Sequence, residues 1–240
     1  NLALGIATYE GEAPVLCQAP DRTVAAAGTF LYADDEPATD RGALGERLMA
    51  LSRRGPLFEH KLEGRFGGVL YDPAAGRLEL GTDRYGLYPL YWHADGAGLW
   101  FATRLAAVVK ANRPKLTSDT DAIADLLAYR HFLGNRTYFR EIQAVPEGSW
   151  LSFRDGQVTT KRYWSYRLEE DEARGTHGAE AAAQLRRAWD RALDAAVDIG
   201  QVGAVPLSGG LDSRAILASL VRRGHAATGV TFGEAMGNDF

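Results

Sequence analysis

The chain has 240 residues, of which 46% are hydrophobic and 10% aromatic, which indicates a globular protein of one or two domains with ordinary hydrophobic cores. Its 27 lysines and arginines are outnumbered by 31 aspartates and glutamates, so a net charge of −4 gives no attraction to nucleic acid or to an acidic membrane. A single cysteine, Cys17, excludes an internal disulfide framework, and the sequence predicts neither a signal peptide nor a membrane span, so we expect a cytoplasmic protein.

The first predicted elements are two strands and a helix. Apolar residues alternate along Leu2–Tyr9 and again along Thr23–Tyr32, as they do in strands with one buried face. A helix follows, and the pair Gly55-Pro56 ends it. Its apolar face is formed by Leu44, Leu48 and Leu51.

Two hairpins are predicted next. The first joins Phe66–Tyr71 to Arg77–Thr82 through a turn at 72–76, and the second joins Tyr88–His93 to Leu99–Thr103 around Asp95-Gly96. Successive hairpins indicate an antiparallel sheet, and such a sheet needs a second layer to cover its apolar face.

The following segments alternate between helix, hairpin and loop. Residues 119–130 predict a helix, Asp155-Gly156 predicts a hairpin turn, and the acidic run 168–178 is interpreted as a solvated linker. A second amphipathic helix then leads to the strand 202–207, and we interpret its Trp189 as a core residue. The apolar stripes are Ala122, Ile123, Leu126 and Leu127 in the first helix, and Ala182, Leu185, Trp189, Leu193 and Ala196 in the second.

A strand, a Gly-Gly turn and a helix succeed one another over residues 202–224. The apolar run Val202–Leu207 has the length of a buried parallel strand, and apolar residues at helical spacing follow until Gly224. The loop Ser208–Ser213 between them lies at the positive end of the helix dipole, where backbone N–H groups point outward. This arrangement favours binding of a polyanion.

Each residue of the loop suits that task, although any Gly-Gly pair can also be an ordinary turn. Gly209 and Gly210 permit positive φ and close approach of the backbone, and Ser208 and Ser213 add hydroxyl donors. Asp212 can hold a Mg²⁺ ion that neutralises a departing polyphosphate.

The run Ser208-Gly-Gly-Leu-Asp-Ser213 resembles the pyrophosphate loop of the N-type ATP pyrophosphatases and is not a Walker A loop, because no Gly-Lys-Ser/Thr follows. The resemblance implies ATP and Mg²⁺ as cofactors, cleavage between the α and β phosphates, and an acyl-adenylate formed on a substrate carboxylate. It also implies a nucleotide site, with Asp212 as metal ligand, made of Leu207, Ser208, Gly209, Gly210, Leu211, Asp212, Ser213, Val230 and Phe232.

Much of the remaining chain resembles the asparagine synthetase family, in matching order. The matching segments are 64–72, 83–91, 99–102, 134–150 and 162–164. The resemblance implies an α/β fold class: an N-terminal Ntn-hydrolase-like domain with αββα layers, then the start of a doubly wound, adenine-nucleotide α-hydrolase-like parallel sheet. The expected domains are 1–115 for the degenerate glutaminase-like part, 116–178 for a connecting helix, hairpin and linker, and 179–240 for an incomplete synthetase part.

Three departures from that family affect the glutaminase. Leu4 stands where the family has its nucleophilic cysteine, and an aliphatic side chain cannot attack an amide. Ala27-Gly28-Thr29 replaces the family's Asn-Gly-Glu and so loses the side-chain amide of the oxyanion site. Ala38-Thr39-Asp40 replaces its Ser-Asp-Thr-Glu segment. These changes predict that glutamine is not hydrolysed by the usual route.

Other reactive residues have plainer interpretations. We interpret Cys17 as a neutral or buried thiol and Asp83-Arg84 as a structural turn. Arg214 could reach a phosphate or simply face solvent from the helix. The histidines lack the spacing of a zinc site; they are His60, His93, His131, His177 and His225.

We therefore expect a carbon–nitrogen ligase that converts ATP to AMP and pyrophosphate and couples a carboxylate to an amine already on the substrate. β-Lactam synthetases, carbapenam synthetases and lasso-peptide macrolactam cyclases are relatives of this kind. The alternatives are an asparagine synthetase that uses glutamine or ammonia, and a non-catalytic ATP-binding homologue. The family's catalytic lysine is expected beyond residue 240, so the 240 residues alone are expected not to turn over. The expected partner is a small-molecule or peptide carboxylate, and a further partner, either the remainder of the synthetase domain or a second copy in a homodimer, stays open.

Overall fold

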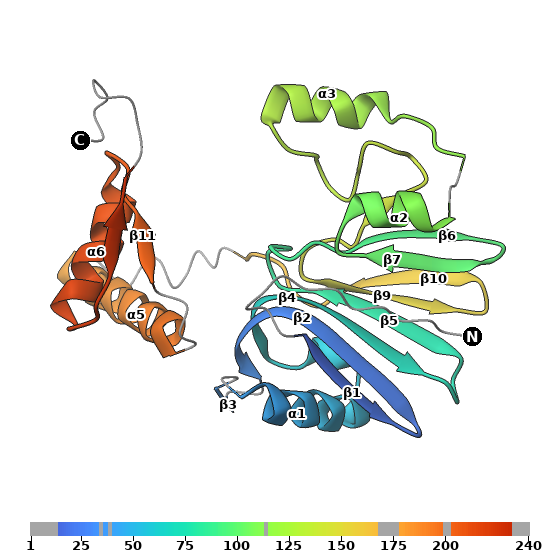
Figure 1. Ribbon diagram of the computed structural model, residues 1–240, viewed down its shortest axis with the longest axis horizontal. Helices are drawn as coiled ribbons and strands as arrows, with labels where there is room; N and C mark the ends of the chain where they lie inside the picture. Colours follow the sequence, from blue (N-terminus) through green and yellow to red (C-terminus); the bar gives the residue numbers. More distant parts are fainter. Residues whose placement is uncertain are drawn as a thin grey trace. The chain divides into compact units, whose positions relative to one another are not determined.

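The computed structural model describes residues 14–33, 36–37, 40–112, 115–167, 178–198 and 203–231. The chain divides into two compact units, 1–166 and 167–240, each of which is taken by itself below (Figure 1). Within the described ranges, no helix has both the length and the apolar character needed to cross a membrane.

A large antiparallel sheet forms the centre of the first unit. Its strands run in the order β1-β2-β4-β5-β9-β10, and β3 pairs with β2 as a seventh strand (Figure 1). The strands are β1 (Val15–Ala19), β2 (Arg22–Ala33), β3 (Glu36–Pro37), β4 (Leu62–Asp72), β5 (Arg77–Thr82), β9 (Ser149–Arg154) and β10 (Gln157–Arg162). The predicted strand over 23–32 and the predicted hairpin over 66–82 are thereby confirmed, whereas the predicted strand over 2–9 lies outside the described residues.

The hairpin between β9 and β10 turns at the two residues that the sequence indicated. Asp155 and Gly156 have φ of 51° and 78°, the left-handed conformation whose twist matches that of paired strands. β9 also pairs with β5. The hairpin was expected in a connecting segment, but this pairing makes it part of the large sheet.

A second, three-stranded sheet has the order β7-β6-β8. Its strands are β6 (Tyr91–Asp95), β7 (Gly98–Ala102) and β8 (Gln143–Ala144). The predicted second hairpin is confirmed, but its first strand begins at Tyr91 rather than Tyr88. Residues 83–88 are held in a turn instead.

The two faces of the large sheet bury different clusters because successive side chains on a strand point to opposite sides. On one face, Phe66 and Leu70 of β4 pack with Leu44 and Leu48 of α1 (Arg41–Arg54). On the other, Val69 of β4 and the leucines of β5 pack with residues of β6 and β7. α2 (Leu105–Asn112) packs on β6 and β7 in turn. The first unit is therefore layered helix, sheet, sheet, helix (Figure 1), as expected.

A short 3-10 helix, η1 (Leu57–Glu59), closes the end of the α1 layer. Its Phe58 lies directly on two glycines of the sheet, Gly68 and Gly81. A Cβ atom at Gly81 would lie 2.3 Å from the Phe58 ring. Only glycine at this position leaves room for the aromatic ring.

Helix α3 (Thr120–Tyr129) begins as predicted but buries less than predicted. The Asp119 carboxylate accepts hydrogen bonds from the N–H groups of Asp121 and Ala122, which caps the helix. Ala122 is buried, whereas Leu127 is 79% exposed. Five residues separate the two, which places them about 140° apart around the helix axis. The predicted stripe is therefore wrong at Leu127.

The second unit contains the predicted strand–loop–helix. Its elements are α5 (Ala179–Asp198), β11 (Ala204–Pro206), α6 (Leu211–Arg222) and β12 (Thr228–Val230). β11 and β12 pair in parallel, with Val205 opposite Gly229. The Trp189 indole N–H of α5 donates to Ser219 Oγ of α6 over 3.1 Å, so Trp189 lies between the helices, as expected of a core residue.

Candidate nucleotide site

The Ser208–Ser213 loop starts at the carboxyl end of β11 and runs into the N-terminus of α6. The Leu207 N–H donates to the Val230 carbonyl over 2.7 Å, which extends the parallel pairing to the first residue before the loop. Gly210 is the N-cap of α6, and no side chain caps it. The N–H groups of the first helical turn have no acceptors within the helix and are available to a ligand.

Two hydroxyl groups tie the loop to this first turn. The Ser208 N–H donates to Ser213 Oγ over 3.2 Å, and Ser213 Oγ donates to the Ser208 carbonyl over 3.3 Å. The Gly210 N–H donates to Ser208 Oγ, also over 3.3 Å. Both serines therefore help to fix the loop's shape, in addition to the donor role that the sequence suggested.

The predicted site residues are brought together in part. Leu207 and Val230 are hydrogen-bonded neighbours, and Ser208, Gly209, Gly210, Leu211, Asp212 and Ser213 follow in one continuous loop and turn. Phe232 lies outside the described residues. Ser208 to Asp212 are exposed, so a ligand can reach them.

Asp212 lies in the first turn of α6 with its side chain in solvent. Among the described residues, no side chain forms an ion pair or hydrogen bond with its carboxylate, and no group of three or more metal-ligating side chains occurs. Mg²⁺ in nucleotide sites often takes only one or two carboxylates, with phosphate oxygens and water completing its shell. An exposed carboxylate beside a phosphate-binding turn fits that requirement.

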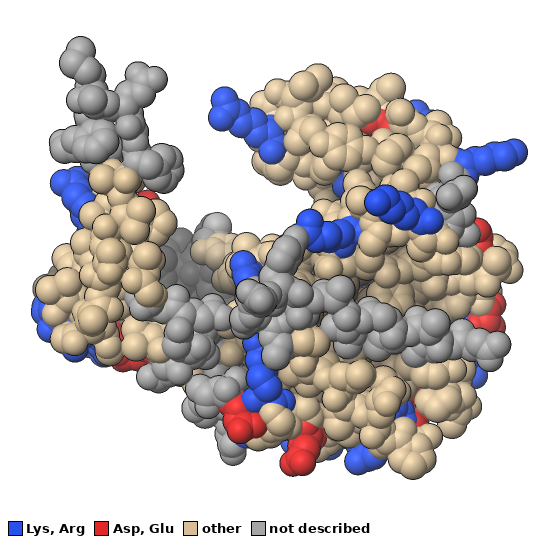
Figure 2. Space-filling model, viewed as in Figure 1, with Lys and Arg blue, Asp and Glu red and all other residues tan. Residues whose placement is uncertain are grey.

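Arg214 is positioned beside the same loop. Its Nε donates to the Gly210 carbonyl over 3.0 Å, one helical turn back. This bond directs the guanidinium towards the loop rather than away from it. Elsewhere, on the face shown in Figure 2, basic and acidic side chains of the described residues are interspersed, and they form no continuous basic surface there.

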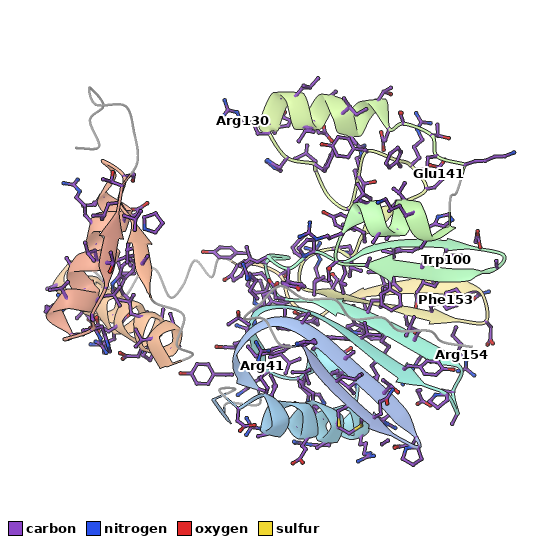
Figure 3. The ribbon with its side chains drawn as sticks, viewed as in Figure 1. Arg41, Trp100, Arg130, Glu141, Phe153 and Arg154 are labelled. Atoms are coloured by element: carbon purple, nitrogen blue, oxygen red, sulfur yellow. The ribbon has the colours of Figure 1, made fainter. Side chains whose placement is uncertain are left out.

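The segment Ala27-Gly28-Thr29, which the resemblance places at an oxyanion site, lies on β2 in the first unit. Gly28 has φ of 108°, and a Cβ atom there would lie 2.2 Å from the Arg65 carbonyl oxygen, so only glycine fits. Arg41 Nη1 donates to the Gly28 carbonyl over 3.0 Å (Figure 3). Ala27 and Thr29 flank this glycine and supply no amide donor. Leu4, expected at the nucleophile position, lies outside the described residues.

The contact between Arg41 and Gly28 could not be predicted from the sequence. Thirteen positions separate the two residues in the sequence, where Arg41 is simply the first residue of a helix. Only the packing of α1 against β2 brings the guanidinium to this carbonyl.

Asp83 is a structural residue, as expected. Its side chain is fully buried, and it accepts hydrogen bonds of 3.0 to 3.3 Å from four backbone N–H groups. The donors are Phe66, Tyr85, Leu87 and Tyr88. This carboxylate holds residues 83–88 in a turn, which is why β6 starts late.

The other reactive groups form no second site within the described part of the chain. His93 Nδ1 bonds the Glu141 carbonyl over 2.8 Å and is buried in the small sheet. Cys17 is a free, half-buried thiol on β1. His177 lies outside the described residues.

Comparison with known proteins identifies the first unit. Residues 45–164 match the glutamine amidotransferase domain family. The chain belongs to this family. The chain is 27% identical over 189 residues to the amidase chyE of Penicillium rubens, a match that covers 75% of the chain and 27% of that protein. The chain thus spans about a quarter of the length of this curated relative.

Two solved structures are also similar. The glutamine phosphoribosylpyrophosphate amidotransferase from B. subtilis, complexed with ADP and GMP, is 15% identical with a TM-score of 0.37 and covers 64% of this chain and 32% of its own. An allosteric regulatory enzyme of purine biosynthesis is 16% identical with a TM-score of 0.40, covering 66% and 32%. Similarity this low carries no argument about function.

Proposed function

We propose that this chain belongs to an AMP-forming amide synthetase of the asparagine synthetase family. In the first step a substrate carboxylate displaces pyrophosphate from ATP and becomes an acyl-adenylate. In the second, an amine attacks the acyl carbon, so that AMP leaves and one proton is released. The observation that carries the proposal is the Ser208–Ser213 loop. It is exposed, it is held by hydrogen bonds of its own hydroxyl groups, and it lies between a parallel strand and a helix N-terminus.

The chain's residues have distinct roles in the first step. The N–H groups at the start of α6 and the Ser208 and Ser213 hydroxyls would donate to the pyrophosphate oxygens. Asp212 would hold a Mg²⁺ ion, which neutralises charge on the departing pyrophosphate when bound. Arg214, held to the Gly210 carbonyl, would place a fixed positive charge beside the same oxygens.

The source of the amine follows from the first unit. The segment Ala27-Gly28-Thr29 offers no side-chain amide to stabilise an oxyanion. This favours an amine supplied by the substrate itself, as in lactam or macrolactam formation, over ammonia released from glutamine.

The comparisons with known proteins favour a second candidate function. The family match is to a glutamine amidotransferase domain, and the curated relative is an amidase, so amide hydrolysis is the chemistry of the relatives. The alternative is therefore an asparagine synthetase that uses glutamine or ammonia.

An adenylation assay of the full-length protein distinguishes these functions. Mg-ATP would be offered with aspartate, a β-amino acid precursor or a leader-free peptide, and AMP and pyrophosphate would be measured with and without glutamine. We expect AMP only with a substrate that carries its own amine, and no response to glutamine. Release of glutamate from glutamine would establish the alternative, and ATP binding without AMP would leave a non-catalytic homologue.

Arg214 allows a separate prediction. Arg214→Ala is expected to weaken binding of pyrophosphate roughly five- to tenfold, because a charge-assisted contact is lost. Arg214→Lys keeps the charge but loses the planar guanidinium, so its loss should be intermediate. Titration calorimetry with Mg-pyrophosphate measures both. Arg222→Ala, at the other end of α6, is the matched control, and an equal loss there would contradict a specific role for Arg214.

A further inference from the structure

Glu79 is a charged residue in the middle of the central strand β5. Its side chain is 1% exposed. Its neighbours Leu78 and Leu80 belong to the cluster between the two sheets, so Glu79 points to the opposite face, towards α1 and η1. On that face it lies between Leu70 of β4 and Ser152 of β9.

The Glu79 carboxylate lacks hydrogen bonds. Among the described residues, neither of its oxygens has a hydrogen-bond partner, although both are buried. Arg77 Nε lies 3.3 Å from Oε1, yet this nitrogen is itself buried without a hydrogen bond. The Arg77 side chain is 40% exposed, so solvent screens part of its charge. Burying a carboxylate in this way is costly, because water is removed and little replaces it.

The other charged groups around Glu79 are engaged elsewhere. They are Arg22 on β2, Asp72 at the end of β4, Arg154 on β9, Lys161 on β10 and Glu59 in η1.

Each of the cations among them has an anionic partner of its own. Lys161 Nζ lies 2.6 Å from Glu59, and Arg22 Nε lies 3.1 Å from Asp21. Arg154 lies 3.4 Å from Asp155 and is mostly exposed. Of the described cations named here, only Arg77 therefore pairs with Glu79.

We propose that Glu79 is a proton-dependent switch of sheet stability: with its proton the β4–β5–β9 sheet packs as observed, and without it a buried charge weakens that sheet. The proposal concerns the first unit alone and does not depend on the nucleotide site.

The direction of the pH dependence follows from burial. Burial raises the pKa of Glu79, and the Arg77 charge opposes this only in part. Below the ordinary glutamate pKa of about 4.3, both the folded and the unfolded chain hold this proton, and the contribution of Glu79 to stability is greatest. As the pH rises, the unfolded chain releases its proton first, so stability falls until the pH has passed the folded pKa and is then constant.

Thermal unfolding of the full chain between about pH 4 and pH 8 tests the proposal. In wild type, the melting temperature of the first unit should fall by a few degrees between the two pKa values, and Glu79→Gln should not show this loss. Glu63→Gln is the matched control, since Glu63 is an exposed glutamate of the neighbouring strand that pairs with Arg84. The melting temperature of Glu63→Gln should change with pH as that of wild type does. Identical profiles for wild type and Glu79→Gln would overturn the proposal.

Two further measurements do not require Glu79→Gln to fold. Carbon-13 NMR of the glutamate side chains in wild type should give one carboxyl that titrates above the others and is missing in Glu79→Met. A full set of ordinary titrations would refute the proposal. Arg77→Met removes the nearest cation, so the stability of this variant should fall more steeply with rising pH than that of wild type. An unchanged slope would also count against the proposal.

Discussion

Asp212→Asn should reduce AMP formation about 100-fold or more while the second unit stays folded. Asparagine keeps the size of the side chain but replaces a charged oxygen with a neutral one, which is a far weaker ligand for Mg²⁺. The loss should appear as a higher Mg²⁺ requirement, so that raising the Mg²⁺ concentration restores part of the rate. Initial rates of pyrophosphate release across a Mg²⁺ titration measure this.

The exposed position of Asp212 allows a loss of activity to be distinguished from a loss of folding. Its side chain is exposed, and its contribution to the helix dipole is at most about 1 kcal/mol, so unfolding cannot explain a large loss of rate. Glu180→Gln is the matched control, because Glu180 is also an acidic residue in the first turn of a helix but is remote from the loop in sequence. If both variants keep the wild-type Mg²⁺ dependence, Asp212 is not the metal ligand.

Local patterns predicted most of the elements of this fold. The alternation along β2, the turn residues Asp155-Gly156 and the leucine face of α1 all act over a few residues, and the structure has each where it was expected. The Ser208–Ser213 loop belongs to the same class, because hydrogen bonds between serines five positions apart hold it. The positive φ expected of its glycines is not found at Gly210, whose φ is −74°.

Features that depend on packing were not predictable in this way. Burial alternates along β1, but its first three residues, Val15-Leu16-Cys17, are all apolar, so the sequence shows no alternation there; the strand forms where β2 provides a partner. Alternation places Glu79 opposite its two leucines, which in isolation suggests a solvent face. It is buried because η1 covers that face with Phe58, and nothing in the sequence around Glu79 reports this.

Long-range contacts explain the remaining differences at the candidate sites. Gly28 and Arg41 meet only because α1 packs on β2, so their hydrogen bond could not be predicted from sequence. The reverse holds for Asp83, whose structural role was expected although its four donors come from two separate segments.

Asp83→Asn should therefore cost about 3–5 kcal/mol in the free energy of unfolding of the first unit, the largest stability effect expected in this chain. The carboxylate accepts four backbone N–H groups and is fully buried. An asparagine has one oxygen, and its NH₂ group would face N–H donors where the second oxygen had accepted. Two backbone donors would then lose their partner in a site that water cannot reach.

The effect should extend beyond the turn, because Asp83 also bonds through its backbone. Its carbonyl accepts from Gly148, the residue before β9, and its N–H donates to Phe66 of β4. Loosening the turn would therefore also weaken the attachment of β4 and of the start of β9. Urea unfolding of wild type, Asp83→Asn and Asp72→Asn measures the difference, since Asp72 accepts only one backbone N–H, from Ala75, at a half-exposed turn. A loss at Asp83 no greater than that at Asp72 would mean that the four hydrogen bonds contribute little net stability and that the turn is held by its apolar contacts instead.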